Sequence, residues 1–139
     1  MDSKFKHLKL KILKQEYQYV LLKNDTDRNV VFEKTTACKS PVGIFVSAEE
    51  FSIITPIDVS FENVALKTEA GWSCFQIVGE MLFGSVQGLI ASISSSLFTE
   101  GLGICVVSTF KSDWFFIRSK NQEQAAKLLA SDGWAVEKE

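Results

Sequence analysis

The apolar pattern of the second half of the chain most constrains what it can fold into. Trp72–Val78 has apolar residues on both of its alternating sides, which predicts a central strand covered on both faces. A stripe of apolar residues at helical spacing follows, formed by Val86, Leu89, Ile90, Ile93 and Leu97. Ser85 is placed to cap the start of this helix, and Gly101 to end it in a left-handed conformation.

Further patterns complete this half of the chain. Asn121 and Gln124 have the spacing of a capping box, and Gly133 stops the helix that they open. Strands are predicted on either side of this helix, over residues 103–109, 113–118 and 134–136. The order strand, helix, strand, strand, helix, strand predicts an α+β fold with an antiparallel sheet, of the ferredoxin-like βαββαβ type.

The first half of the chain is poor in helix signals. Strands are predicted at Lys6–Leu13, Tyr17–Leu22, Val30–Glu33, Val42–Ser47 and Phe51–Thr55. Thr35–Pro41 is predicted to be a loop, Ala48–Glu50 a single helical turn, and Asp58–Ala70 a polar link between the halves. We therefore expect two units, residues 1–60 and residues 61–139.

A sheet with apolar residues on both faces has a physical consequence. In a single βαββαβ unit the helices cover one sheet face only, so apolar residues on the other face need a cover. The N-terminal half of the chain and a second subunit are both candidates for this cover.

Composition and charge exclude several classes of function. The net charge of −2 gives no general attraction to nucleic acid or anionic lipid. The lysines from Lys4 to Lys14 alternate with Leu8, Leu10 and Ile12, so we interpret them as the solvent face of an amphipathic strand. No apolar run is long enough to span a membrane, and the N-terminus lacks the apolar core of a secretory signal. We expect a cytoplasmic protein with no nucleic-acid or membrane partner.

Signals for catalysis and for metal binding are also weak. Cys38, Cys74 and Cys105 are widely spaced and form no CxxC pair. His7 is the only histidine and lies in a lysine-rich segment without a nucleophile motif. The acidic pair Glu49–Glu50 is interpreted as solvated carboxylates at a short turn. We therefore expect no catalytic residue, no metal, no cofactor and no enzymatic activity.

Two parts of the sequence resemble the ACT-domain superfamily of small-molecule-sensing modules. Ser47–Ile54, which reads SAEEFSII, is similar to an acidic segment that closes the first unit of short two-ACT proteins of bacteria and fungi. Gly84–Ile93 resembles the ligand loop and helix of the second unit of those proteins, which are related to the cytosolic arginine sensors of animals. Ser108–Phe110 with Asp113 resembles the strand end of the same unit.

The resemblance implies two tandem ACT-like units, often doubled into a homodimer, that bind an amino acid in a regulatory role. In the sensor relatives the ligand lies between two units. The positions that match the ligand-binding segments are Gly84, Ser85, Val86, Ser108, Thr109, Phe110 and Asp113. Gln87 and Gly88 stand where the arginine sensors tend to have more acidic residues, which argues against arginine as the ligand.

The chemistry of these residues suits a zwitterion. The N–H groups at the start of a helix donate to an α-carboxylate, while Asp113 offers a carboxylate to an α-ammonium. Phe83 and Phe110 are placed to contact a ligand side chain. A structural interpretation also stands, in which Gly84 serves a tight turn and Asp113 a hairpin. We expect a regulatory protein that binds a small amino acid or similar zwitterion, and the alternative is a structural or protein-interaction module of the same fold without a ligand.

Overall fold

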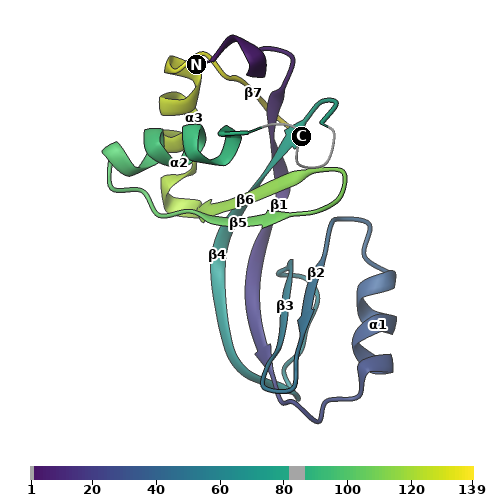
Figure 1. Cartoon of the computed structure of the whole chain (residues 1–139). Helices are drawn as coiled ribbons and strands as arrows, with labels where there is room; N and C mark the ends of the chain where they lie inside the picture. The colour runs from purple at the N-terminus through teal and green to yellow at the C-terminus, as the bar shows by residue number, and fades with distance from the viewer. Residues whose placement is uncertain (1, 82–86) are drawn as a thin grey trace. The chain divides into compact units, whose positions relative to one another are not determined.

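The chain forms two compact units in the computed structural model, which describes residues 2–81 and 87–139. Unit one contains residues 1–14 and 72–139, and unit two contains residues 15–71. The elements, labelled in Figure 1, are the strands β1 (Lys9–Leu22), β2 (Gly43–Val46), β3 (Phe51–Pro56), β4 (Ala65–Val78), β5 (Cys105–Ser108), β6 (Asp113–Arg118) and β7 (Ala135–Lys138), the helices α1 (Arg28–Thr36), α2 (Leu89–Thr99) and α3 (Gln122–Ser131), and the 3₁₀ turns η1 (Ser3–Phe5) and η2 (Ser119–Asn121).

The second half of β4 begins a βαββαβ order in unit one, followed by α2, β5, β6, α3 and β7. β6 pairs antiparallel with both β4 and β5. The last strand, β7, does not close the sheet against β4 but pairs in parallel with Lys9–Ile12 of β1. The strand order in unit one is therefore β7-β1-β4-β6-β5, with the N-terminal strand inserted between the first and last strands of the βαββαβ order. This arrangement confirms the prediction of an α+β fold with a largely antiparallel sheet.

Two helices cover one face of the unit one sheet (Figure 1). Leu89, Ile93 and Leu97 form the buried side of α2, at the spacing that the sequence predicts. They pack in one core with residues from all parts of unit one, namely Phe5, Leu8, Leu10, Ile12, Phe75, Ile77, Leu102, Phe115, Ile117, Ala125, Leu129 and Trp134. A hydrogen bond from the Ser96 hydroxyl to the Asp132 carboxylate links α2 to the end of α3.

Both helices of unit one end at a glycine with positive φ, as predicted. Gly101 has φ +70° and Gly133 has φ +104°. In each case the N–H of the following residue donates to a carbonyl five residues back, Leu102 to Leu97 at 3.0 Å and Trp134 to Leu129 at 3.1 Å. Leu102 and Trp134 are themselves buried in the core. This hydrogen-bond pattern with its apolar contact is the Schellman motif.

The opposite face of the same sheet contains Cys74 and Phe116, which are cross-strand partners and both buried. Beside them, the guanidinium of Arg118 lies 4.1 Å from the ring centre of its partner Trp72. The burial of Cys74 and Phe116 agrees with the prediction that β4 is apolar on both faces. The prediction that a second subunit or the N-terminal half covers this face stays a prediction.

Unit two contains the second part of β1, α1, β2, β3 and the first part of β4. β3 pairs antiparallel with β1 over Tyr17–Leu22 and with β2 on its other side, so β2 is an edge strand. Its core is small and contains Val20, Leu22, Val31, Phe51, Ile53 and Phe61. Of these residues only Val31 comes from α1.

Several predictions for unit two were wrong. Val30–Glu33 is not a strand but lies within α1, which begins where the Asp27 carboxylate accepts a hydrogen bond from the N–H of Asn29 at 2.9 Å. The β-branched residues of this helix mimic a strand pattern, and its weak apolar stripe gives no helix signal. The two strands predicted between Lys6 and Leu22 are one continuous strand, and the expected polar link already contains the start of β4 at Ala65.

Two predicted helix starts also differ. α2 begins at Leu89, after Gly88 with φ +79° at the N-cap, so the helix starts later than the predicted stripe. The predicted cap, Ser85, lies outside the described residues. Asn121 is the N-cap of α3, but its side chain makes no capping hydrogen bond, so the predicted capping box does not form.

The expected units and the observed units differ in one respect. The expected division, 1–60 and 61–139, assigns the N-terminal residues to the first unit. In the structure, residues 1–14 group with residues 72–139, because they supply Phe5, Leu8 and Leu10 to the core of unit one.

Candidate functional site

Four of the predicted ligand-binding residues lie together on the β5–β6 hairpin of unit one. Ser108 and Asp113 are paired residues where the two strands meet the turn, and Thr109 and Phe110 belong to the turn between them. The three predicted residues Gly84, Ser85 and Val86 lie outside the described residues. The structure therefore brings together four of the seven predicted residues, and the role of the other three stays a prediction.

The turn residue Thr109 already has a structural role. Its backbone N–H donates to the Ser112 carbonyl at 2.8 Å, and its hydroxyl donates to the same oxygen at 2.9 Å. The Thr109 hydroxyl also accepts a hydrogen bond from the Ser112 N–H at 3.2 Å. These bonds fix the turn, so the Thr109 hydroxyl is engaged within the protein.

Two other hairpin residues present groups that a ligand can reach. The side chain of Phe110 is 76% exposed at the tip of the turn. Asp113 is half-buried, and its carboxylate makes no hydrogen bond or ion pair within residues 2–81 and 87–139. An exposed ring next to such a carboxylate offers an apolar contact together with an acceptor for an ammonium group.

The single histidine and the acidic pair have hydrogen-bond partners within the protein. The ring Nε2 of His7 lies 3.2 Å from the carbonyl oxygen of Glu80. The Ser47 hydroxyl accepts hydrogen bonds from the N–H groups of Glu49 and Glu50 at 3.2 and 3.0 Å, which forms a short capped turn. No group of three or more metal-ligating side chains lies within the described residues.

The thiol of Cys74 is chemically inert. Burial raises the pKa of the Cys74 thiol to about 12, and the negative charge of Glu139 adds to this effect. A thiol with so high a pKa stays protonated near neutral pH and is neither a nucleophile nor a ready metal ligand. Its position in β4 is that of a small apolar residue, as the sequence pattern indicates.

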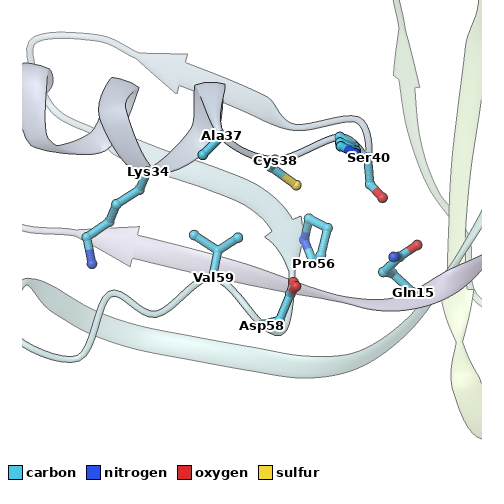
Figure 2. A pocket seen from close by; sticks show the side chains of 9 residues that line it. Gln15, Lys34, Ala37, Cys38, Ser40, Pro56, Asp58 and Val59 are labelled. Carbon is cyan, nitrogen blue, oxygen red and sulfur yellow. The ribbon is translucent and has the colours of Figure 1, made fainter.

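A pocket with a volume of about 370 Å³ lies within unit two (Figure 2). The first wall is formed by the end of α1 and the segment that follows it, and the second by the end of β3 and the turn that follows it. The pocket is lined by Gln15, Lys34, Ala37, Cys38, Lys39, Ser40, Pro56, Asp58 and Val59. The sequence does not predict it, because loop residues show no periodicity and no motif marks this group.

Hydrogen bonds from two adjacent residues of β1 hold both walls of the pocket. The Tyr17 hydroxyl donates to the carbonyl of Pro41 at 2.8 Å, next to the first wall. The buried amide of Gln18 donates to the carbonyls of Pro56 and Val59 at 3.3 and 2.8 Å, in the second wall. The walls are thus attached to the same strand.

Part of the sequence matches the profile of a known family. A family profile described as the ACT domain matches residues 67–131 of the chain, which include most of unit one. None of the curated proteins matches the sequence. No helix among the described residues is long and apolar enough to cross a membrane.

Several solved structures resemble the chain. Protein Atu0741 from Agrobacterium tumefaciens is 34% identical, with a TM-score of 0.80 over 96% of this chain and 94% of that one. A protein of unknown function from Vibrio cholerae, VC0802, described as a possible transport protein, is 14% identical, with a TM-score of 0.67 over 91% of each chain. The regulatory subunit of aspartate kinase from Thermus thermophilus is 11% identical, with a TM-score of 0.62 over 88% of this chain and 95% of that one. At such low identity, the last two show a shared fold only. The chain therefore belongs to the same family as Atu0741, and its residues 67–131 match the ACT-domain profile.

Proposed function

We propose that this protein is a non-catalytic regulatory module that binds a small amino acid or a similar zwitterion at the β5–β6 hairpin of unit one. The observation that carries the proposal is the hairpin itself, where Phe110 is exposed and the Asp113 carboxylate has no partner among the described residues. The ACT match supports a regulatory role. So does the regulatory subunit of aspartate kinase from Thermus thermophilus, which shares the fold.

In this proposal each hairpin group has a distinct role. The Asp113 carboxylate accepts hydrogen bonds from the ligand ammonium, and the Phe110 ring packs on the ligand side chain. Gly84, Ser85 and Val86, which lie outside the described residues, are proposed to supply N–H donors for the ligand carboxylate together with the start of α2. We further propose that unit two is a reduced second ACT-like unit and that the relation to the arginine sensors extends to fold rather than to arginine binding.

A thermal-shift screen of the full chain against the twenty amino acids tests the proposal. A ligand at a hundred times its dissociation constant adds about 2.7 kcal/mol to the free energy of unfolding, which raises Tm by roughly 5 to 10 °C. Asp113→Asn should remove the part of the shift that binding at the hairpin causes, and Asp25→Asn, at an exposed turn of unit two, should leave the shift unchanged. If no amino acid raises Tm, the protein is better described as a structural or interaction module without a ligand.

We also propose that the protein is a homodimer. Phe45 on the edge strand β2 is 64% exposed, and Phe98 at the end of α2 is 81% exposed, so each unit presents an aromatic surface to a partner. Light scattering coupled to gel filtration should give twice the monomer mass of 15.5 kDa. A monomer mass at micromolar concentration would contradict this part of the proposal.

A further inference from the structure

We propose that the pocket of unit two is a second binding site, specific for an α-amino acid with an apolar side chain. It lies wholly within residues 15–71, so it is distinct from the hairpin site of unit one. Its volume of about 370 Å³ lies in the lower part of the range for small-molecule sites, about 300 to 1,000 Å³. A single amino acid is a suitable occupant for a pocket of this size.

The second wall of the pocket is held in place before any ligand arrives. The Gln18 amide fixes the carbonyls of Pro56 and Val59, and the N–H of Ile57 donates to the Glu16 carbonyl at 3.0 Å. The N–H of Val59 donates to the Pro56 carbonyl at 3.2 Å, which closes the turn that contains Asp58. A preformed wall reduces the ordering cost of binding.

The charges of the pocket match a zwitterion. The Lys34 ammonium is engaged, since it donates to the Ser60 carbonyl at 2.6 Å and lies 5.5 Å from the ring centre of Phe61. Lys39 in the first wall and Asp58 in the second form no ion pair with any described residue. A cation and an anion on facing segments, neither of them paired within the described part of the chain, suit a ligand carboxylate and a ligand ammonium.

The remaining lining residues determine the side-chain class. Ala37, Pro56 and Val59 contribute apolar surface to the lining of the pocket (Figure 2). Ser40 and Gln15, on the right of the pocket in Figure 2, offer neutral hydrogen-bonding groups from two different segments. We therefore assign the ligand side chain to the apolar part of the pocket, in contact with Pro56 and Val59.

Cys38 provides a built-in reporter, because its thiol lines the pocket and is half-buried. The experiment measures the rate of iodoacetamide alkylation at each cysteine of the full chain by mass spectrometry. L-leucine, L-isoleucine, L-valine and L-methionine are the probes. A probe at ten times its dissociation constant leaves about one eleventh of the pockets free, so the rate at Cys38 should fall about tenfold. The rate at Cys105, half-buried in unit one, is the internal control.

Matched ligands and variants complete the test. Isoamylamine lacks the carboxylate of leucine and 4-methylpentanoate lacks its ammonium, so each should protect Cys38 at least fivefold less well. Lys39→Gln and Asp58→Asn should each weaken protection by leucine about fivefold, since both side chains are exposed and their charges are partly screened. Asp113→Asn, on the hairpin of unit one, should not change protection at Cys38.

Three results would overturn the proposal. The first is that none of the four amino acids slows alkylation of Cys38. The second is that isoamylamine or 4-methylpentanoate protects as well as leucine, which means that a single charge is recognised. The third is that protection persists in a Lys39→Gln and Asp58→Asn double variant, which places the ligand elsewhere. Because the hairpin site is tested by Asp113→Asn, the failure of either site is distinguishable from the failure of the other.

Discussion

At the scale of single residues, the three cysteines differ in environment. Cys74 is fully buried and its pKa is raised to about 12, whereas Cys38 and Cys105 are half-buried. Alkylation by iodoacetamide at pH 8 in the native state should therefore modify Cys38 and Cys105 but leave Cys74 unmodified. Addition of denaturant should make all three thiols react, as counted by intact mass. Native-state modification of Cys74 at a rate similar to Cys105 would contradict this assignment.

The exposed pair formed by Glu123 and Lys138 gives a prediction about pH. A 2.8 Å hydrogen bond from Lys138, together with its charge, lowers the pKa of Glu123. Because the pKa of Glu123 is lower in the folded state, its stabilising contribution is present above the unfolded pKa and is lost as the pH falls through the folded pKa. Lys138→Ala should raise the pKa of Glu123 in an NMR titration of its carboxyl carbon. Lys9→Ala, which removes a 4.0 Å pair with Glu137, should leave the Glu123 titration unchanged.

At the scale of elements, the end of α2 depends on one glycine. Gly101 has φ +70°, and a Cβ added there meets no atom within 4 Å, so the cost of Gly101→Ala is backbone strain alone. We expect a loss of about 1 to 2 kcal/mol in the free energy of unfolding, measured by urea denaturation. Gly103→Ala is a matched control, because a Cβ there is equally free of contacts and φ is not positive. Equal losses for both variants would show that the left-handed turn is not the cause.

Elements differ in how well the sequence predicts them, for physical reasons. α2 is predictable because one stripe of three buried residues packs on the core. α1 is not, because only Val31 and Thr35 are buried along its length, so its sequence has little periodicity. The continuous strand β1 is predicted as two strands because Lys14 and Gln15 are exposed midway along it, and an exposed polar pair is typical of a turn.

The two candidate sites also differ in how well a local sequence pattern predicts them. The hairpin residues could be predicted because a strand end with a distinctive sequence lies next to a short turn. The pocket of unit two could not, because Cys38 and Asp58 are in separate connecting segments that only tertiary hydrogen bonds from Tyr17 and Gln18 hold in place. No local pattern records such contacts between distant residues.

At the scale of the whole molecule, the first residues of the chain belong to the core of unit one. Phe5, Leu8, Leu10 and Ile12 are all buried there. A fragment of residues 61–139 lacks all four side chains, and the loss of even one large buried side chain typically costs about 2 to 5 kcal/mol. We expect this fragment to lack a cooperative thermal transition by circular dichroism.

A linked chain that keeps residues 1–14 is the matched control for the role of these residues in the core of unit one. Residues 1–14 joined by a flexible Gly/Ser linker to residues 72–139 restore the whole of unit one. This linked chain should unfold cooperatively, and its amide NMR spectrum should be well dispersed. If the 61–139 fragment is as stable as the linked chain, the assignment of the N-terminal strand to this core is wrong.

The pairing of β1 with β7 determines how the protein responds to mechanical force. These two terminal strands run in parallel, and the N–H of Glu139 donates to the Ile12 carbonyl at 2.8 Å. A pull on the two chain ends draws β1 and β7 past each other in opposite directions along their length. The hydrogen bonds between them are then loaded together in shear, not broken one after another as in a zipper. The protein should therefore resist stretching from its termini far better than stretching that peels β7 away from its neighbour.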